Sequence, residues 1–146
     1  MAMMAAAVAN GGEMMRTYVV DASLGSQDRV LTRTQPSAWL RPITPQTAAT
    51  LNELMQAVVT DGTASCCLSL AGGISAAAKT GTAQLNNDGE PEESHAWIVA
   101  FAPAENPQYA VAVMLEGTNA DISASTGGRL AGPIAERMLN AALANG

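Results

Sequence analysis

The chain has 146 residues, enough for one domain or a large part of one and long enough to bury a core. It carries 7 Lys and Arg against 13 Asp and Glu, a formal net charge of −6, and contains no basic run, so nucleic acid and anionic membrane surfaces are poor candidates as partners. No segment holds the roughly 20 consecutive apolar residues that a transmembrane helix needs.

The first 32 residues predict a helix followed by a loose β excursion. Residues 1–9 are Ala, Met and Val, and the Asn-Gly-Gly that follows is a good left-handed end signal. Because this helix has no polar face and no N-cap residue, we expect it to be buried and to be the second half of a longer helix. The β-prone runs at 17–20 and 29–32, separated by DASLGSQD, predict a hairpin.

A second helix is predicted to begin after Thr44. Thr44 suits the N-cap position and Pro45 the first helical position. Asp61 and Gly62 end the helix. An apolar stripe at helical spacing marks the face expected to be buried: Leu51, Leu54, Met55 and Val58.

The two cysteines of the chain, Cys66 and Cys67, are adjacent. A bond between neighbouring cysteines closes a strained ring, so we expect two small buried thiols. No CxxC pair or histidine cluster accompanies them. We therefore expect neither a metal site nor a cofactor.

From residue 76 the pattern changes to strands. Residues 76–84, 96–102 and 109–116 are β-prone runs joined by the turns NNDGEPEES and PAENPQ, which predicts an antiparallel meander. Strands with two apolar faces indicate helices on both sides of the sheet. One of these helices is C-terminal, with Pro133 in its first turn and a stripe of Leu130, Ile134, Met138 and Leu139. The predicted fold class is α/β of the α+β type, an antiparallel sheet flanked by helices.

Lys79 is the only lysine of the chain, and it lies in the apolar stretch AAAKTGTAQ. Residues 73–80 nearly fit the phosphate-loop pattern G-x-x-x-x-G-K-[ST], but Ala78 replaces the second glycine and no helix follows. We therefore reject a phosphate loop. A lysine that lays its stem over the sheet and keeps its charge in water is the structural alternative. The tripeptide K-T-G, in contrast, is the strand motif of the serine penicillin-binding enzymes.

Three longer stretches extend this motif: AAKTGTAQ, HAWIVAFAPAENPQYAVAVMLE and GGRLAGPIAERML, with MAMMAAAVANGG and VVTDGTAS upstream. In this order they resemble the C-terminal part of the class B penicillin-binding proteins, the peptidoglycan D,D-transpeptidases. The resemblance implies that residues 1–146 are the C-terminal segment of a transpeptidase domain. They would supply the last three strands of a five-stranded β-lactamase-like sheet, and the apolar edge of the 109–116 strand would be left unpaired.

The resemblance also implies a substrate site on residues 79–82. Its ligands would be a peptidoglycan stem peptide ending in D-alanine or a β-lactam, both of which carry a carboxylate. Lys79 would place a positive charge near this carboxylate, and Thr80 and Thr82 would offer it hydroxyls. Gly81 would leave room for the ligand. The backbone N–H of Thr82 would be one donor of the oxyanion hole, which gives it a catalytic role together with Lys79.

Neither the nucleophile motif of the family, S-x-x-K, nor its second motif, S-x-N, occurs in this chain. Ser75 stands one residue too far from Lys79 to share a helical face with it. The resemblance therefore implies an upstream segment that carries both motifs and a chain that is inactive by itself. It also implies a place on the extracytoplasmic face of the bacterial membrane, through an anchor outside this chain. His95, the only histidine, is expected to be a solvated loop-end residue without a catalytic role.

Two alternatives remain open. A β-lactamase-like hydrolase or sensor would share K-T-G and differ in how the acyl-enzyme is resolved. A non-catalytic assembly module of the same fold would use the open edge of the sheet to bind another chain.

Overall fold

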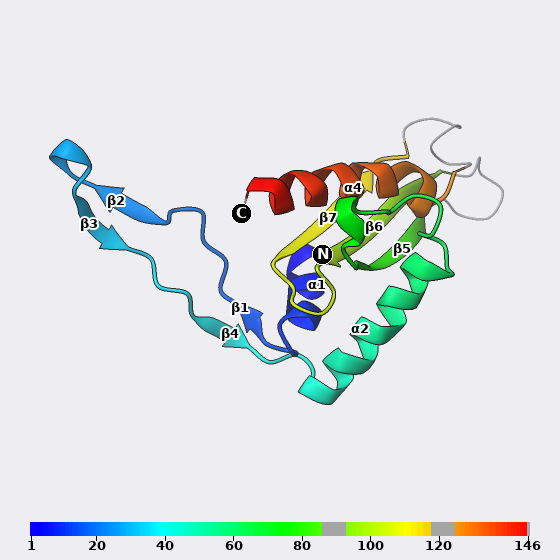
Figure 1. The fold of residues 1–146 in the computed structure, drawn as a ribbon, viewed down its shortest axis with the longest axis horizontal. Coiled ribbons are helices and arrows are strands. Elements are labelled where there is room, and N and C mark those ends of the chain that lie inside the picture. The colour runs from blue at the N-terminus through cyan, green and yellow to red at the C-terminus, as the bar shows by residue number, and fades with distance from the viewer. Residues whose placement is uncertain (86–92, 118–124, 146) are drawn as a thin grey trace.

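A three-stranded antiparallel sheet forms the centre of the molecule. The computed structural model describes residues 1–85, 93–117 and 125–145. It places the strands β5 (Ala77–Gln84), β6 (Ser94–Ala102) and β7 (Tyr109–Leu115) in the order β5-β6-β7 (Figure 1). The predicted meander is therefore confirmed, although most of its first turn, residues 86–92, lies outside the described residues.

Helices cover both faces of this sheet, as its apolar composition predicts. α4 (Gly127–Asn145) packs on the face that carries Ile98, whereas α1 (Ala2–Ala9) and α2 (Pro45–Thr60) lie on the face that carries Phe101. Figure 1 shows α4 above the sheet and α2 below it. Ile98 and Phe101 are both fully buried, so the sheet is the middle layer of three.

α4 contacts the sheet through small residues and not through the predicted large ones. Ile134 and Met138 are 39% and 51% exposed, so the predicted stripe is wrong at these positions. The residues that the helix buries are Gly127, Gly128, Ala131, Gly132, Ala135 and Leu139. A helix held this close to its neighbours leaves no space for large side chains between them, and these side chains turn outward.

The predicted start of this helix is also wrong. Pro133 stands inside α4 and not in its first turn, because the helix already begins at Gly127. The N–H of Leu130 donates to the carbonyl oxygen of Thr126 at 3.1 Å, which forms a first turn well before the proline.

α2 has the boundaries that its sequence predicts. The hydroxyl of Thr44 accepts a backbone N–H of the first turn, Pro45 stands at the first helical position, and Asp61 ends the helix. Its predicted apolar stripe enters the core only in part, with Leu51 and Val58 half-buried. Met55 is buried, but Leu54 is 60% exposed.

α1 is also less buried than its composition predicts. Ala5 and Ala7 are 2% exposed, whereas Met1 and Met4 are 57% and 59% exposed. The helix is therefore covered on its alanine side alone. No helix in the described ranges is long and apolar enough to cross a bilayer.

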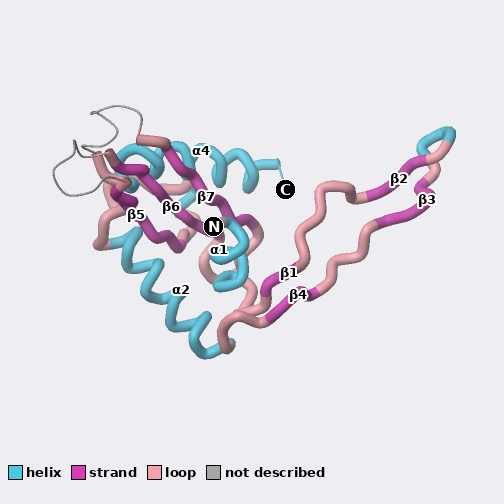
Figure 2. The backbone as a smooth tube through the Cα atoms, turned by 180° about the vertical axis from the view of Figure 1, so that it is seen from behind, coloured by secondary structure: helices cyan, strands magenta, loops and turns pink. Residues whose placement is uncertain are grey.

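A two-stranded arm, residues 14–40, projects from the layered body (Figure 2). Near its tip β2 (Ala22–Leu24) pairs with β3 (Val30–Arg33), and at its base β1 (Met14–Met15) pairs with β4 (Ala38–Leu40). Both pairs are antiparallel, so the predicted hairpin is confirmed as an element.

The first strand of this hairpin was predicted at the wrong residues. Residues 17–20 are β-prone but belong to no strand, and Val19 among them is fully exposed. The ion pair between Asp21 and Arg33, 2.7 Å long, and the turn at Ser26–Asp28 set the register, so that pairing begins after Asp21. The β propensity of residues 17–20 does not produce a strand, because no neighbouring strand of the described structure lies beside them.

The start of β5 is tied to the connection between β6 and β7. A 3₁₀ turn, Ala71–Gly73, precedes the strand. The N–H of Ala104 donates to the carbonyl oxygen of Ser75 at 3.0 Å and to its hydroxyl at 3.1 Å. The hydroxyl of Ser75 in turn donates to the carboxylate of Glu105, which lowers the pKa of that carboxylate below its ordinary value. These bonds fix the point at which β5 enters the sheet.

Candidate functional site

The K-T-G-T motif lies on β5, the edge strand of the sheet. In the described part of the chain no strand pairs with the outer side of β5. Ala78, which precedes the motif, is fully buried. Lys79 and Thr82 are exposed, and Thr80 is half-buried. The motif therefore runs from the core to an open edge where an extended peptide has room to pair.

The register divides the four motif residues between the two faces of β5. Lys79 lies opposite Val99 and Gly81 opposite Trp97, on the side of α1 and α2. Thr80 and Thr82 alternate with them and point to the side of α4, so the predicted pair of hydroxyls does share one face. A ligand at the strand edge is in reach of both faces.

The ammonium group of Lys79 is not paired with a carboxylate within the described ranges. Its Nζ donates to the carbonyl oxygen of Thr80. In a chain with a net charge of −6, this is a cation available to an anionic ligand. Backbone groups of alternate residues in an antiparallel strand point the same way, so the position of this carbonyl predicts that the N–H of Thr82 also faces the open edge.

An apolar hollow of about 720 Å³ lies beside Lys79, between α1, α2 and β5. Its wall includes Met1, Met4, Val8, Leu51, Leu54, Met55, Val58 and Val99. Lys79 contributes the only charged side chain among the described residues that line it. The exposed apolar side chains of the two helices, Met1 and Met4 of α1 and Leu54 of α2, thus line one hollow.

On the opposite face, the first turn of α4 lies against the backbone of the site. A Cβ added at Gly127 would stand 2.1 Å from the carbonyl oxygen of Trp97 and 2.6 Å from that of Gly81. Real Cβ atoms do not approach backbone oxygen this closely, so only glycine fits between α4 and the motif. Gly127 and Gly128 belong to the stretch GGRLAGPIAERML that carries the family resemblance, but no pattern in the sequence indicates their contact with the site.

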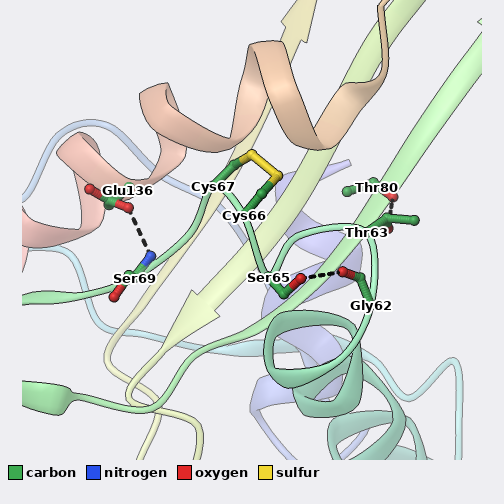
Figure 3. The surroundings of a disulfide bond; sticks show 8 residues. All are labelled: Gly62, Thr63, Ser65, Cys66, Cys67, Ser69, Thr80 and Glu136. Carbon is green, nitrogen blue, oxygen red and sulfur yellow. Dashed lines mark hydrogen bonds between the residues drawn. A yellow bond between two sulfur atoms is a disulfide. The ribbon is translucent and has the colours of Figure 1, made fainter.

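The loop that joins α2 to β5 holds a second residue that the sequence analysis missed. The hydroxyls of Thr63 and Thr80 are 2.6 Å apart (Figure 3). Thr63 follows the Asp61-Gly62 helix end directly, and no pattern in the sequence marks it. Its partner is 17 residues away, so only the fold brings the two hydroxyls together.

The same loop corrects the expectation for the cysteines. Cys66 and Cys67 form a disulfide, and they are exposed and half-buried, so the prediction of two buried thiols is wrong (Figure 3). The loop runs along the surface beside α4, which keeps the pair out of the core. The backbone N–H of Ser69 donates to the carboxylate of Glu136 at 2.8 Å, which holds the end of this loop on α4.

His95 has a structural contact and takes no part in the motif. Its Nδ1 accepts the backbone N–H of Gly117 at 2.9 Å, and the ring is half-buried. This bond ties the start of β6 to the chain after β7. The expectation of a solvated histidine is therefore wrong at Nδ1, because a backbone N–H occupies this nitrogen. Among the described residues no cluster of three or more His, Cys, Asp and Glu side chains could hold a metal ion.

An antiparallel sheet between helix layers, with K-T-G-T on its edge strand, is typical of the serine penicillin-binding enzymes and the β-lactamases. Residues 1–140 match the penicillin-binding protein transpeptidase domain, and the chain belongs to this family. The resemblance to class B members is thereby confirmed.

Individual relatives are peptidoglycan D,D-transpeptidases. The chain is 41% identical to PbpA of Mycolicibacterium smegmatis over 147 residues, covering 99% of this chain and 29% of that protein. It is 40% identical to PbpA of Mycobacterium tuberculosis H37Rv over 139 residues, covering 95% and 28%. The chain thus spans less than one third of the curated relatives it matches.

Solved structures agree with these matches. A ceftriaxone acyl-enzyme complex of penicillin-binding protein A from M. tuberculosis superposes with a TM-score of 0.85 at 39% identity, over 97% of this chain and 31% of that one. The D,D-transpeptidase domain of a peptidoglycan glycosyltransferase from Eggerthella lenta gives a TM-score of 0.79 at 28% identity, over 99% and 31%.

We predict that the Cys66–Cys67 disulfide forms in the air-oxidised protein. A thiol alkylating reagent should add to neither cysteine in denaturant, and to both after reduction, because the only cysteines of the chain are bonded to each other. Intact mass spectrometry counts the added groups. Two groups added without reduction would contradict the disulfide.

Proposed function

We propose that this chain is the C-terminal segment of a serine D,D-transpeptidase domain, and that its β5 strand binds the carboxylate of the substrate. One observation carries the proposal. Among the described residues, β5 is an edge strand with a lysine that pairs with no carboxylate and with two hydroxyls on one face, in a chain similar to the PbpA transpeptidases. An extended peptide that ends in D-alanine, or a β-lactam, offers an edge strand a backbone to pair with and a carboxylate to bind.

Each motif residue has a separate task in this proposal. Thr80 and Thr82 donate their hydroxyls to the carboxylate, and Lys79 supplies the positive charge beside it. Gly81 keeps the strand free of a side chain between the two threonines. The N–H of Thr82 stabilises the negative charge on the carbonyl oxygen under attack.

The reaction itself needs a serine from outside this chain. Its hydroxyl attacks the carbonyl carbon of the D-Ala–D-Ala bond and loses its proton to a base in the upstream segment. The C–N bond breaks and D-alanine leaves as the protonated amine. The amine of a neighbouring peptide then attacks the ester and releases the serine. The relatives with solved β-lactam acyl-enzymes support a covalent step of this type.

We further propose that the apolar hollow receives the upstream segment that carries S-x-x-K and S-x-N. Lys79 lines this hollow, so a segment seated there would stand beside the motif. Burial of the exposed stripes of α1 and α2 would stabilise the assembly by about 25 cal/mol for each Å² of apolar surface removed from water. The place of action would be the extracytoplasmic face of the membrane, where peptidoglycan is cross-linked. The names of the relatives favour transpeptidation over β-lactam hydrolysis.

The first test of the proposal is covalent labelling by a fluorescent penicillin. The chain alone should not be labelled, because it lacks the S-x-x-K motif that carries the nucleophilic serine, and adding the upstream segment should restore labelling. Leu54→Asp should abolish this restoration, because Leu54 lines the hollow and is 60% exposed.

Leu31→Asp is the matched control, because Leu31 is 55% exposed on the arm and does not line the hollow. It should leave the restored labelling unchanged. Stable labelling of the chain alone would refute the proposal that the nucleophilic serine lies in the upstream segment. A stable chain that does not bind the upstream segment would favour the alternative of a non-catalytic assembly module.

The second test is Lys79→Ala in the complete enzyme. A charged hydrogen bond to a carboxylate contributes about 1.5–3 kcal/mol, so the second-order rate constant for penicillin acylation should fall by about 10- to 100-fold. The melting temperature of this chain by itself should change little, because the Lys79 side chain is exposed in it.

Arg33→Ala removes an exposed cation from the arm and serves as the control for charge alone. It should leave the acylation rate constant unchanged. An acylation rate constant of Lys79→Ala equal to that of the parent would contradict the role of the lysine.

A further inference from the structure

The hydroxyl of Thr80 is held by a residue outside the motif. Thr63 Oγ1 lies 2.6 Å from Thr80 Oγ1 and is its hydrogen-bond partner (Figure 3). The two side chains belong to different elements, Thr63 to the loop after α2 and Thr80 to β5. The orientation of a substrate-facing hydroxyl thus depends on where this loop lies.

The backbone on both sides of Thr63 is fixed. A Cβ at Gly62 would stand 2.7 Å from the Cα of Val58, so the chain can turn back over the end of α2 only with glycine there. Ala64 is fully buried, and its N–H donates to the carbonyl oxygen of Val58 at 3.1 Å. Thr63 therefore stands between two anchored neighbours.

α4 closes this arrangement from the other side. A Cβ at Gly128 would stand 2.1 Å from the carbonyl oxygen of Thr63 and 3.4 Å from Cγ2 of Thr80. The glycine thus packs against both threonines at once. The backbone of Thr63 is therefore held beside Thr80, although the Thr63 side chain is exposed to solvent.

The chemistry of two paired hydroxyls decides what this contact does. A hydroxyl donates one hydrogen bond and accepts two. If Thr63 donates, the oxygen of Thr80 is satisfied as an acceptor and its own proton is free to point at a ligand. If Thr80 donates instead, its proton is used up inside the protein. An anionic ligand selects the first arrangement, because only that one offers it a proton.

We propose that Thr63 is a positioning residue that donates to Thr80 and so directs the Thr80 proton to the carboxylate of the substrate. The inference rests on the proposed function of β5. It adds a residue that determines how well the site discriminates ligands with a carboxylate from ligands without one. Thr63 itself does not touch the ligand.

The test compares two ligands in the full-length transpeptidase, benzylpenicillin and its methyl ester. The readout is the ratio of their acylation rate constants. Thr63→Val should lower this ratio by about two- to tenfold, the effect expected when the one neutral hydrogen bond that orients Thr80 is lost. It should do so by slowing benzylpenicillin and leaving the ester unchanged. Thr63→Ser, which keeps the hydroxyl, should stay within about twofold of the parent.

A double-mutant cycle links the effect to Thr80. Thr80→Val should lower the ratio by itself, and Thr63→Val should add nothing in that background. Thr50→Val is the matched control, because Thr50 is an exposed threonine of α2 whose hydroxyl bonds only within its own helix. It should leave the ratio unchanged.

The outcomes separate this inference from the function on which it rests. A lower ratio in Thr80→Val with an unchanged ratio in Thr63→Val would overturn the role of Thr63 and leave the carboxylate site standing. An equal loss for both ligands in Thr63→Val would also overturn it, since that is the mark of a merely structural residue. An unchanged ratio in Thr80→Val would refute the carboxylate site itself. If Thr63→Val does not fold, a tenfold lower ratio in Thr63→Ser overturns the inference.

Discussion

The close contact between the first turn of α4 and the strand edge is the constraint on which the site depends. Gly127 lies over the carbonyl oxygens of Trp97 and Gly81, and Gly128 lies over Thr63 and Thr80. A methyl group at either position would push the helix away from the backbone of the motif. Because α4 is held at this distance, β5 and the loop after α2 meet at a fixed separation. The hydrogen bond between the two threonines follows from this geometry.

The helices cover the two faces of the sheet to different extents. On the α4 side, small residues allow close packing, and the core there is continuous from the loop after α2 to β7. On the other side, α1 and α2 leave an apolar hollow against β5. Lys79 lies at the boundary, with its stem over this hollow and its charge unpaired among the described residues. At the edge of β5, the hydroxyls of Thr80 and Thr82 therefore lie on the α4 side, and the charge of Lys79 lies on the side of the hollow.

The sequence predicts the elements of the fold well where the pattern is local. The sheet order and the capping of α2 by Thr44 follow from strand length, turn residues and the N-cap signal. The prediction from sequence fails where contacts with residues far away in the chain determine which side chains are buried or bonded. Ile134 and Met138 read as a core stripe, but glycine and alanine bring α4 too close for them. The Thr63 contact spans 17 residues and depends on α4, so no pattern near Thr63 could reveal it.

The central claim is that the edge of β5 binds the carboxylate of the substrate. A crystal structure of the complete enzyme acylated by benzylpenicillin tests it most directly. The account predicts that the carboxylate of the bound penicillin lies within about 3 Å of the hydroxyls of Thr80 and Thr82. It also predicts that the acyl carbonyl oxygen accepts the N–H of Thr82. A carboxylate bound elsewhere, with the edge of β5 unoccupied, would contradict the account.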